Sequence, residues 1–146
     1  MIAGLAALVL LGQSPWIRPR LNKASLLDKR TPVGAADFIE QQGLTGHIFH
    51  PQIFGDYLIW RLWPRQKSFI DGRVHLFDLE FIRESNMVLR DSHWQEVLQH
   101  WDIQYVLLSK SSEDDDELKA IEAIRNSSRW KNRYEDGVSV LFEAIH

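Results

Sequence analysis

The sequence predicts an α/β domain with a single mixed, mostly parallel sheet of about five strands. Three observations favour this class. Short apolar runs alternate with amphipathic helical segments along residues 31–146. The segments between the first three runs are long enough to be crossover helices, which parallel strands require. The last two runs flank Asp136-Gly137, a pair typical of a tight antiparallel hairpin.

The first helix is expected to begin at Thr31, which can cap a helix that has Pro32 in its first position. Gly43 is expected to end it. Its apolar face has the spacing i, i+3, i+4 and consists of Ala35, Phe38 and Ile39. Residues 46–50 then form a short buried strand, which Pro51 terminates.

Residues 54–63 are apolar almost all round, so their periodicity does not separate a buried helix from a strand. A short helix is the preferred interpretation, because it would cross between two strands and end at Pro64. Residues 67–70 are predicted as the second strand, which leads into Asp71-Gly72-Arg73.

A longer helix is predicted over residues 75–90, with an apolar stripe of Phe77, Phe81 and Val88 that Ile82 and Leu89 widen. Ser92 and Gln95 fit a capping box at the start of another helix. Its apolar face is the clearest helical pattern in the chain and consists of Trp94, Val97, Leu98 and Trp101. Residues 105–109 form the third predicted strand.

The acidic run 113–116 contains an Asp-x-Asp pattern, which can hold a divalent ion through paired carboxylates. The alternative, which we favour, is the start of a helix, because Ser112 and Asp115 fit a capping box and the helix dipole favours acidic residues there. The apolar face of that helix would be Leu118, Ile121 and Ile124. The hairpin follows, with alternating side chains at Trp130, Asn132, Tyr134, Val138, Val140 and Phe142.

Residues 1–12 are a continuous apolar run, too short to cross a bilayer alone because a spanning helix needs about 20 residues. The run is interpreted as part of a transmembrane helix or as a signal or anchor; a helix packed on the domain is the alternative. Residues 13–30 are predicted to be a linker, broken by Pro15 and Pro19. The basic residues that follow the run favour a cytoplasmic flank.

Composition and motif content exclude several classes of function. The net charge of −3 gives no electrostatic argument for nucleic acid, and the absence of cysteine excludes disulfides, thiolate zinc sites and cysteine nucleophiles. The histidines make a poor metal site, because His47 and His50 point to opposite faces of a strand, and His93 and His100 lie about 10 Å apart along a helix. No phosphate-binding loop, dinucleotide motif or serine-hydrolase elbow occurs. We predict no metal, cofactor or catalytic residue.

The best candidate ligand site lies where the first three predicted strands end. If these strands are parallel, His50, Asp71 and Ser109 share the sheet edge at which open α/β sheets bind ligands. Side chains within a few residues would join them: Asp56, Arg73 and Lys110. Asp71 could act as an acid or base, and Arg73 could bind a carboxylate or phosphate. The alternative is structural: Asp71 closes the turn, Gly72 takes a positive φ and Arg73 pairs with a nearby carboxylate.

The order of motifs resembles one known family. The positions that carry the resemblance span about residues 30–143 and are Pro32, Gly43, Gly46, Ile48, Phe49, Gly55, residues 57–62, 69–73 and 105–108, Trp130 and residues 134–136. With these positions the sequence is similar to the soluble C-terminal domain of bacterial multi-pass membrane proteins that resemble dolichyl-phosphate-mannose-protein mannosyltransferases. His50 and Asp56 depart from it, because the family pattern has an asparagine and a second glycine there.

This resemblance implies a non-catalytic extracytoplasmic domain of a membrane-bound glycosyltransferase-like protein, whose catalytic carboxylate lies in the membrane region. The domain would support or select a glycan acceptor or lipid-linked sugar, and residues 1–12 would end the last membrane helix. Two alternatives stay open: a free-standing anchored binding or interaction module, and a small enzyme that uses Asp71. Placement on the cytoplasmic side is the alternative location.

Overall fold

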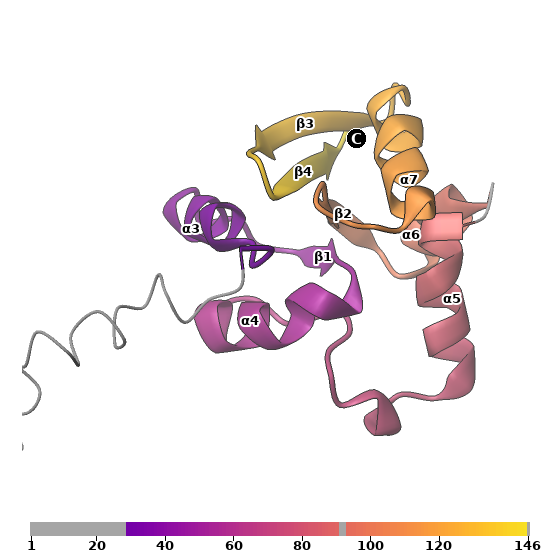
Figure 1. Cartoon of the computed structure of the whole chain (residues 1–146), viewed down its shortest axis with the longest axis horizontal. Coiled ribbons are helices and arrows are strands. Elements are labelled where there is room, and N and C mark those ends of the chain that lie inside the picture. Colours follow the sequence, from indigo (N-terminus) through magenta and orange to yellow (C-terminus); the bar gives the residue numbers. More distant parts are fainter. Residues whose placement is uncertain (1–28, 91–92, 146) are drawn as a thin grey trace, which may run out of the picture. The chain divides into compact units, whose positions relative to one another are not determined.

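The computed structural model describes residues 29–90 and 93–145. A compact unit spans Pro32–His146, and its helices and strands are drawn in Figure 1. The membrane or anchor segment expected at residues 1–12, and nearly all of the linker expected at 13–30, lie outside the described residues. Within the part that is described, no helix is long and apolar enough to span a bilayer.

The sheet has four strands in the order β1-β2-β4-β3 and is mixed. The strands are β1 (His47–Phe49), β2 (Ile103–Ser109), β3 (Trp130–Glu135) and β4 (Ser139–Ala144). Only β1 and β2 pair in parallel; β4 is antiparallel to both β2 and β3. The α/β class is confirmed, whereas the prediction of about five mostly parallel strands is wrong, because residues 67–70 form no strand and the C-terminal hairpin places β4 directly beside β2.

Helices cover both faces of this sheet (Figure 1). One apolar cluster joins α3 (Val33–Gln41) and α4 (Gln52–Leu62) to side chains such as Tyr105, Leu107 and Leu141. The other joins α5 (Leu79–Arg90), α6 (Trp94–His100) and α7 (Asp115–Arg125) to Val106, Leu108 and Phe142. Alternate residues of β2 and β4 therefore enter opposite cores, as the two-residue period of a strand requires.

Several helix starts differ from the prediction for identifiable reasons. Helix α3 begins at Val33 with Pro32 as its N-cap, one residue later than predicted. The helix predicted over 75–90 is divided into a 3-10 turn, η1 (Val74–Leu76), and α5. Asp78 causes this division, since its Oδ1 accepts from the Phe81 N–H (2.8 Å) and so caps α5. The capping box with Ser92 lies outside the described residues.

At α7 and the hairpin the predicted elements exist with shifted ends. Asp114, not Ser112, is the N-cap of α7, because its Oδ1 accepts from the Asp116 N–H at 3.0 Å. Leu118 is 40% exposed and does not join the core. The hairpin loop is three residues long, and Gly137 does not adopt a positive φ. The Asp136 Oδ1 holds this loop by accepting from the backbone N–H groups of Val138 and Ser139.

Candidate functional site

His50 is 1% exposed and lies directly after β1. The Phe69 N–H donates to its Nε2 at 3.0 Å, and its Nδ1 lies 3.1 Å from the Pro51 carbonyl oxygen. A backbone N–H only donates and a carbonyl only accepts, so the two contacts together require the neutral tautomer protonated on Nδ1. Burial lowers the pKa of His50 to about 4, against smaller opposing effects of Pro51 and Asp71. His50 therefore fastens residues 68–70 to the end of β1.

Asp71 and Arg73 form a closed pair. The Asp71 carboxylate is 2% exposed and accepts from Arg73 Nε at 2.9 Å, from the second guanidinium nitrogen at 2.8 Å and from the Arg73 backbone N–H at 2.8 Å. These bonds, above all those from the side chain, hold the pKa of Asp71 below its usual range. With both oxygens occupied, Asp71 is poorly placed to take or give a proton.

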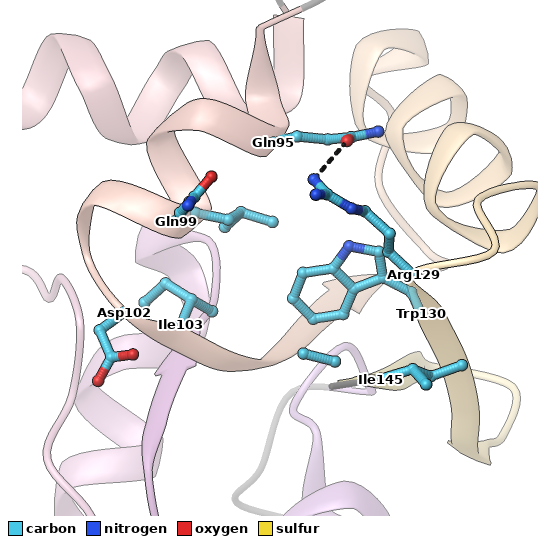
Figure 2. A pocket seen from close by; sticks show the side chains of 9 residues that line it. Gln95, Gln99, Asp102, Ile103, Arg129, Trp130 and Ile145 are labelled. Atoms are coloured by element: carbon cyan, nitrogen blue, oxygen red, sulfur yellow. Dashed lines mark hydrogen bonds between the residues drawn. The ribbon is translucent and has the colours of Figure 1, made fainter.

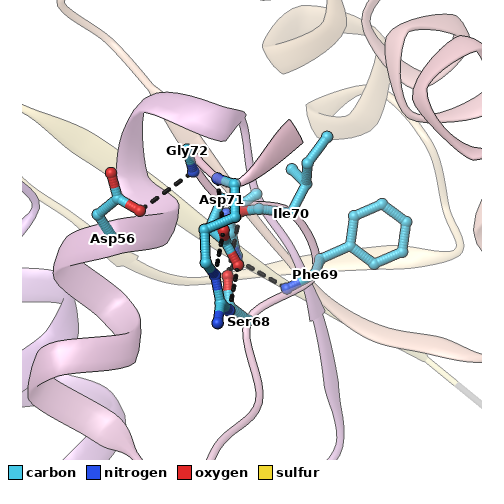
Figure 3. Close-up of polar contacts among 8 residues, drawn as sticks. Asp56, Ser68, Phe69, Ile70, Asp71 and Gly72 are labelled. Carbon is cyan, nitrogen blue, oxygen red and sulfur yellow. Dashed lines mark hydrogen bonds and ion pairs between the residues drawn. The ribbon is translucent and has the colours of Figure 1, made fainter. Parts of the chain in front are cut away.

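Helix α4 holds the same loop from the other side (Figure 3). Asp56 Oδ1 accepts from the Gly72 N–H at 3.1 Å. A Cβ on Gly55 would lie 2.0 Å from the Ile70 carbonyl oxygen, so the loop crosses α4 exactly where a side chain is absent. Gly72 does not adopt the predicted positive φ. Its lack of a side chain matters because a Cβ there would meet the Asp56 carboxylate at 2.8 Å.

Ser109 and Lys110 belong to a different cluster. The Ser109 N–H donates to Glu117 Oε1 of α7 at 2.8 Å, and Lys110 Nζ donates to the Asp136 carbonyl oxygen at 2.9 Å and pairs with Glu135 at 2.7 Å. Phe49 is level with Val106, so Ser109 extends three residues, or about 10 Å, beyond the end of β1.

The predicted site is thus divided. His50, Asp56, Asp71 and Arg73 are brought together, but as a clamp on the loop that follows α4. The premise of three parallel strands is wrong, since Asp71 follows a loop and not a strand. The structural interpretation of Asp71 as the residue that closes the turn agrees with these contacts.

A cleft that the sequence did not predict lies at the opposite end of β2 (Figure 2). Its volume is about 310 Å³, and it is lined by Gln95, Leu98, Gln99, Asp102, Ile103, Arg129, Trp130, Ala144 and Ile145. Buried Leu98 and Ile103 supply apolar lining. In Figure 2 the Trp130 indole comes from one wall, whereas Gln99 and Asp102 come from the other, at the end of α6.

The polar groups of the cleft are held in place by their local structure. Arg129 donates to Gln95 Oε1 at 3.3 Å, while its backbone oxygen accepts from the Ile145 N–H at 2.7 Å. Asp102 has a φ of 49°, the left-handed conformation that ends α6. The His47 ring and the Gln104 amide both lie against the Asp102 carbonyl oxygen, at 3.1 and 2.6 Å, and the side chain of Asp102 is 81% exposed.

This arrangement suits a neutral ligand rich in hydroxyl groups. The amides of Gln95 and Gln99 can donate and accept, the Asp102 carboxylate accepts, and the Arg129 guanidinium donates. The Trp130 ring face carries partial negative charge, which attracts weakly positive C–H groups. A second cleft of about 250 Å³ between α3 and α4 offers less, because Glu40 on its wall is already paired with Arg61 and Arg65.

The described residues contain no cluster of three or more histidine, aspartate or glutamate side chains that could hold a metal ion. Comparison of the chain with protein-family models, with curated proteins and with solved structures finds no match. The function is therefore inferred from the chemistry of the site and from the sequence resemblance.

Proposed function

We propose that this chain is a non-catalytic glycan-binding domain on the extracytoplasmic side of a membrane-bound, glycosyltransferase-like protein, where it selects or holds the acceptor. The observation that carries the proposal is the cleft at Trp130. An indole face beside amide, carboxylate and guanidinium groups matches a sugar ring, which has C–H groups on its faces and hydroxyl groups around its edge.

The side chains of the cleft favour binding over catalysis. Glycoside chemistry generally needs two carboxyl groups about 5–10 Å apart, and Asp102 is the one carboxylate among the described lining residues. The small enzyme based on Asp71 is disfavoured, because that carboxylate is sequestered by Arg73. A free-standing anchored module would bind a glycan in the same cleft. It differs from the proposed domain only in that it would not be part of a larger glycosyltransferase-like protein.

The attachment to a membrane rests on the sequence. Residues 1–12 are apolar throughout, and the resemblance assigns such a run to the end of a membrane helix. An antibody against residues 31–146 tests this placement on an immunoblot of native membranes. A membrane band far above 17.1 kDa is expected, and a band at 17.1 kDa would favour the free-standing module.

The glycan proposal is tested by nuclear magnetic resonance on the full chain, with nitrogen-15 in the tryptophan indoles. The sample is held in a zwitterionic phosphocholine detergent, because a glycoside detergent would compete for the cleft. The probes are the methyl glycosides of mannose, glucose, galactose and N-acetylglucosamine. At least one glycoside is expected to shift the indole signal of Trp130. That signal is identified as the one missing from the spectrum of Trp130→Ala.

The matched variants are Trp130→Ala and Trp60→Ala. Trp130→Ala should weaken binding by at least about tenfold, which corresponds to about 1.4 kcal/mol. Trp60 is 62% exposed on α4, away from the cleft lining, and its replacement should leave the affinity unchanged. Equal losses in both variants, or no response to any of the four glycosides, would overturn the proposal.

A further inference from the structure

The outer face of α4 is unusually apolar. Ile53, Asp56 and Trp60 have the spacing i, i+3, i+7 and therefore share one side of the helix, and Trp63 follows as its C-cap. Ile53 is 60% exposed, Trp60 62% and Trp63 63%. None of these three joins either apolar core cluster.

The loop after α4 extends this surface. Asp56 accepts from the Gly72 N–H, so Gly72 lies beside the exposed face of the helix (Figure 3). The chain then presents Val74 and Leu76 in η1 and Leu79 at the start of α5, and Leu79 is 85% exposed. We call the six side chains the α4 surface: Ile53, Trp60, Trp63, Val74, Leu76 and Leu79.

This concentration is not a chance scatter of exposed apolar residues. Eight large apolar side chains are exposed in the described part of the chain, and the α4 surface holds six of them, the other two being Leu118 and Ile145. Scattered single apolar residues are normal on a protein surface, whereas their concentration in one segment, here residues 53–79, indicates a contact site.

The charges near this surface are mixed, because exposed Asp56, Asp78 and Glu80 lie in the same segment as three exposed cations. The side chain of Arg65 is 80% exposed, that of Arg73 is 59% exposed, and Lys67 is also exposed. Exposed tryptophans, aliphatic residues and cations together are the combination that proteins use at the boundary between lipid headgroups and acyl chains.

We propose that the α4 surface rests on the lipid bilayer, with Leu76 and Leu79 inserted at the headgroup boundary and Trp60 and Trp63 beside them. The bilayer is preferred as the occupant because the same chain carries the apolar run 1–12, which would keep the domain close to lipid. This inference rests on the membrane attachment in the proposed function, but not on glycan binding. The cleft at Trp130 lies elsewhere and would stay open to the solvent.

The absence of cysteine permits an unambiguous test by single-cysteine labelling. The full chain is reconstituted into vesicles of phosphatidylcholine and phosphatidylglycerol, with an environment-sensitive fluorophore at Leu79→Cys or at Lys131→Cys. Lys131 is exposed on β3, the edge strand farthest from β1, and serves as the matched control. Spin-labelled lipid should quench the fluorophore at position 79, and aqueous iodide should quench the one at 131.

A second variant adds Trp63→Ser and Leu76→Ser to the Leu79→Cys chain. It should lose most of the lipid quenching while its urea unfolding midpoint stays the same, since the replaced side chains are exposed. Vesicle flotation separates the possible failures. Equal iodide quenching at both positions in chains that float would overturn the α4 surface as a lipid contact, and chains that do not float would overturn membrane attachment as well.

Protection of position 79 from iodide before vesicles are added would also overturn the proposal. That result would show that another part of the chain, or a second copy of it, covers the surface.

Discussion

His50 is buried in a single protonation state, because its two contacts with backbone groups fix the direction of those hydrogen bonds. A proton on Nε2 would face the Phe69 N–H and break the contact that holds the loop. In the unfolded chain the ordinary pKa of 6.5 applies, whereas the folded value is about 4. The unfolded state therefore binds more protons between these values, so stability is complete above pH 6.5 and falls as the pH drops toward about 4.

As the pH falls from 6.5 to about 4, protonation of His50 in the unfolded chain should lower the free energy of unfolding by about 3 kcal/mol. Urea unfolding at a series of pH values measures it, and His50→Gln is the control because it keeps an acceptor without titrating. Between about pH 6.5 and 5, above the usual range of carboxyl groups, the variant should show a much flatter dependence. Parallel curves for the two proteins would contradict the assignment.

Gly55 allows the loop to touch α4. In Gly55→Ala the new Cβ would lie 2.0 Å from the Ile70 carbonyl oxygen and 2.7 Å from the Asp71 Cα, so backbone must move. We expect a loss of about 3 kcal/mol or more in the free energy of unfolding, at the upper end for overpacking. Gly137→Ala is the matched control, since nothing lies within 4 Å and its φ is not left-handed, and its effect should stay within about 0.5 kcal/mol.

At the scale of elements, Glu117 connects α7 to the end of β2. Its carboxylate is 5% exposed and accepts from the Ser109 N–H, and burial raises its pKa above the usual value. A raised folded pKa means that this group contributes less stability as the pH rises and the carboxyl ionises. A neutral acceptor of the same shape should therefore serve better at neutral pH.

We expect Glu117→Gln to equal or exceed the parent in stability at pH 7, an advantage that should vanish in acid, where Glu117 is protonated. Glu117→Ala should cost about 1–3 kcal/mol, because it leaves the Ser109 N–H buried without a partner. Thermal unfolding at the two pH values distinguishes the variants. A destabilised Glu117→Gln at pH 7 would show that the charge itself, at the N-terminus of α7, stabilises the fold.

The elements with strong periodicity could be predicted from the sequence, whereas residues 67–70 could not. Trp94, Val97 and Leu98 gave α6 its buried face, and the helix exists as expected. The stretch 67–70 has the composition of a strand, yet the Phe69 N–H is taken by the His50 side chain instead of a neighbouring strand. A hydrogen bond from a backbone N–H to a side chain leaves no periodic signal in the sequence. Because residues 67–70 form no strand, the parallel sheet edge that was inferred from that strand does not exist either.

At the scale of the whole molecule, the cleft was hidden from sequence reasoning because three distant segments build it. Residues 95–103, 129–130 and 144–145 meet through the pairing of β4 with both β2 and β3. Trp130 was the one available signal, as an aromatic residue at the start of a strand, but its alternation with Asn132 and Tyr134 assigned it to the hairpin alone. By contrast, the predicted site was grouped by the expectation that His50, Asp71 and Ser109 each follow a parallel strand, and Ser109 lies in a different cluster.

The loop clamp around Asp71 and the cleft at Trp130 lie far enough apart to test which of them binds the ligand. Phe49 and His50 end β1, while the cleft lies where β2 begins at Ile103, so the loop clamp and the cleft occupy opposite ends of the parallel pair. Asp102→Asn replaces a charged acceptor of the cleft by an amide donor, and Gln99→Ala removes an amide. Each should weaken glycoside binding several-fold to tenfold, by about 1 kcal/mol.

Arg73→Ala removes an exposed guanidinium from the clamp and should leave that affinity unchanged, although the pKa of Asp71 should rise toward its ordinary value once its largest stabilising contact is gone. Glycoside titration of the three variants, with the Asp71 carboxyl followed by carbon-13 resonance, measures both effects. Loss of affinity in Arg73→Ala together with retention in Asp102→Asn would return the binding site to the sheet end that the sequence first suggested.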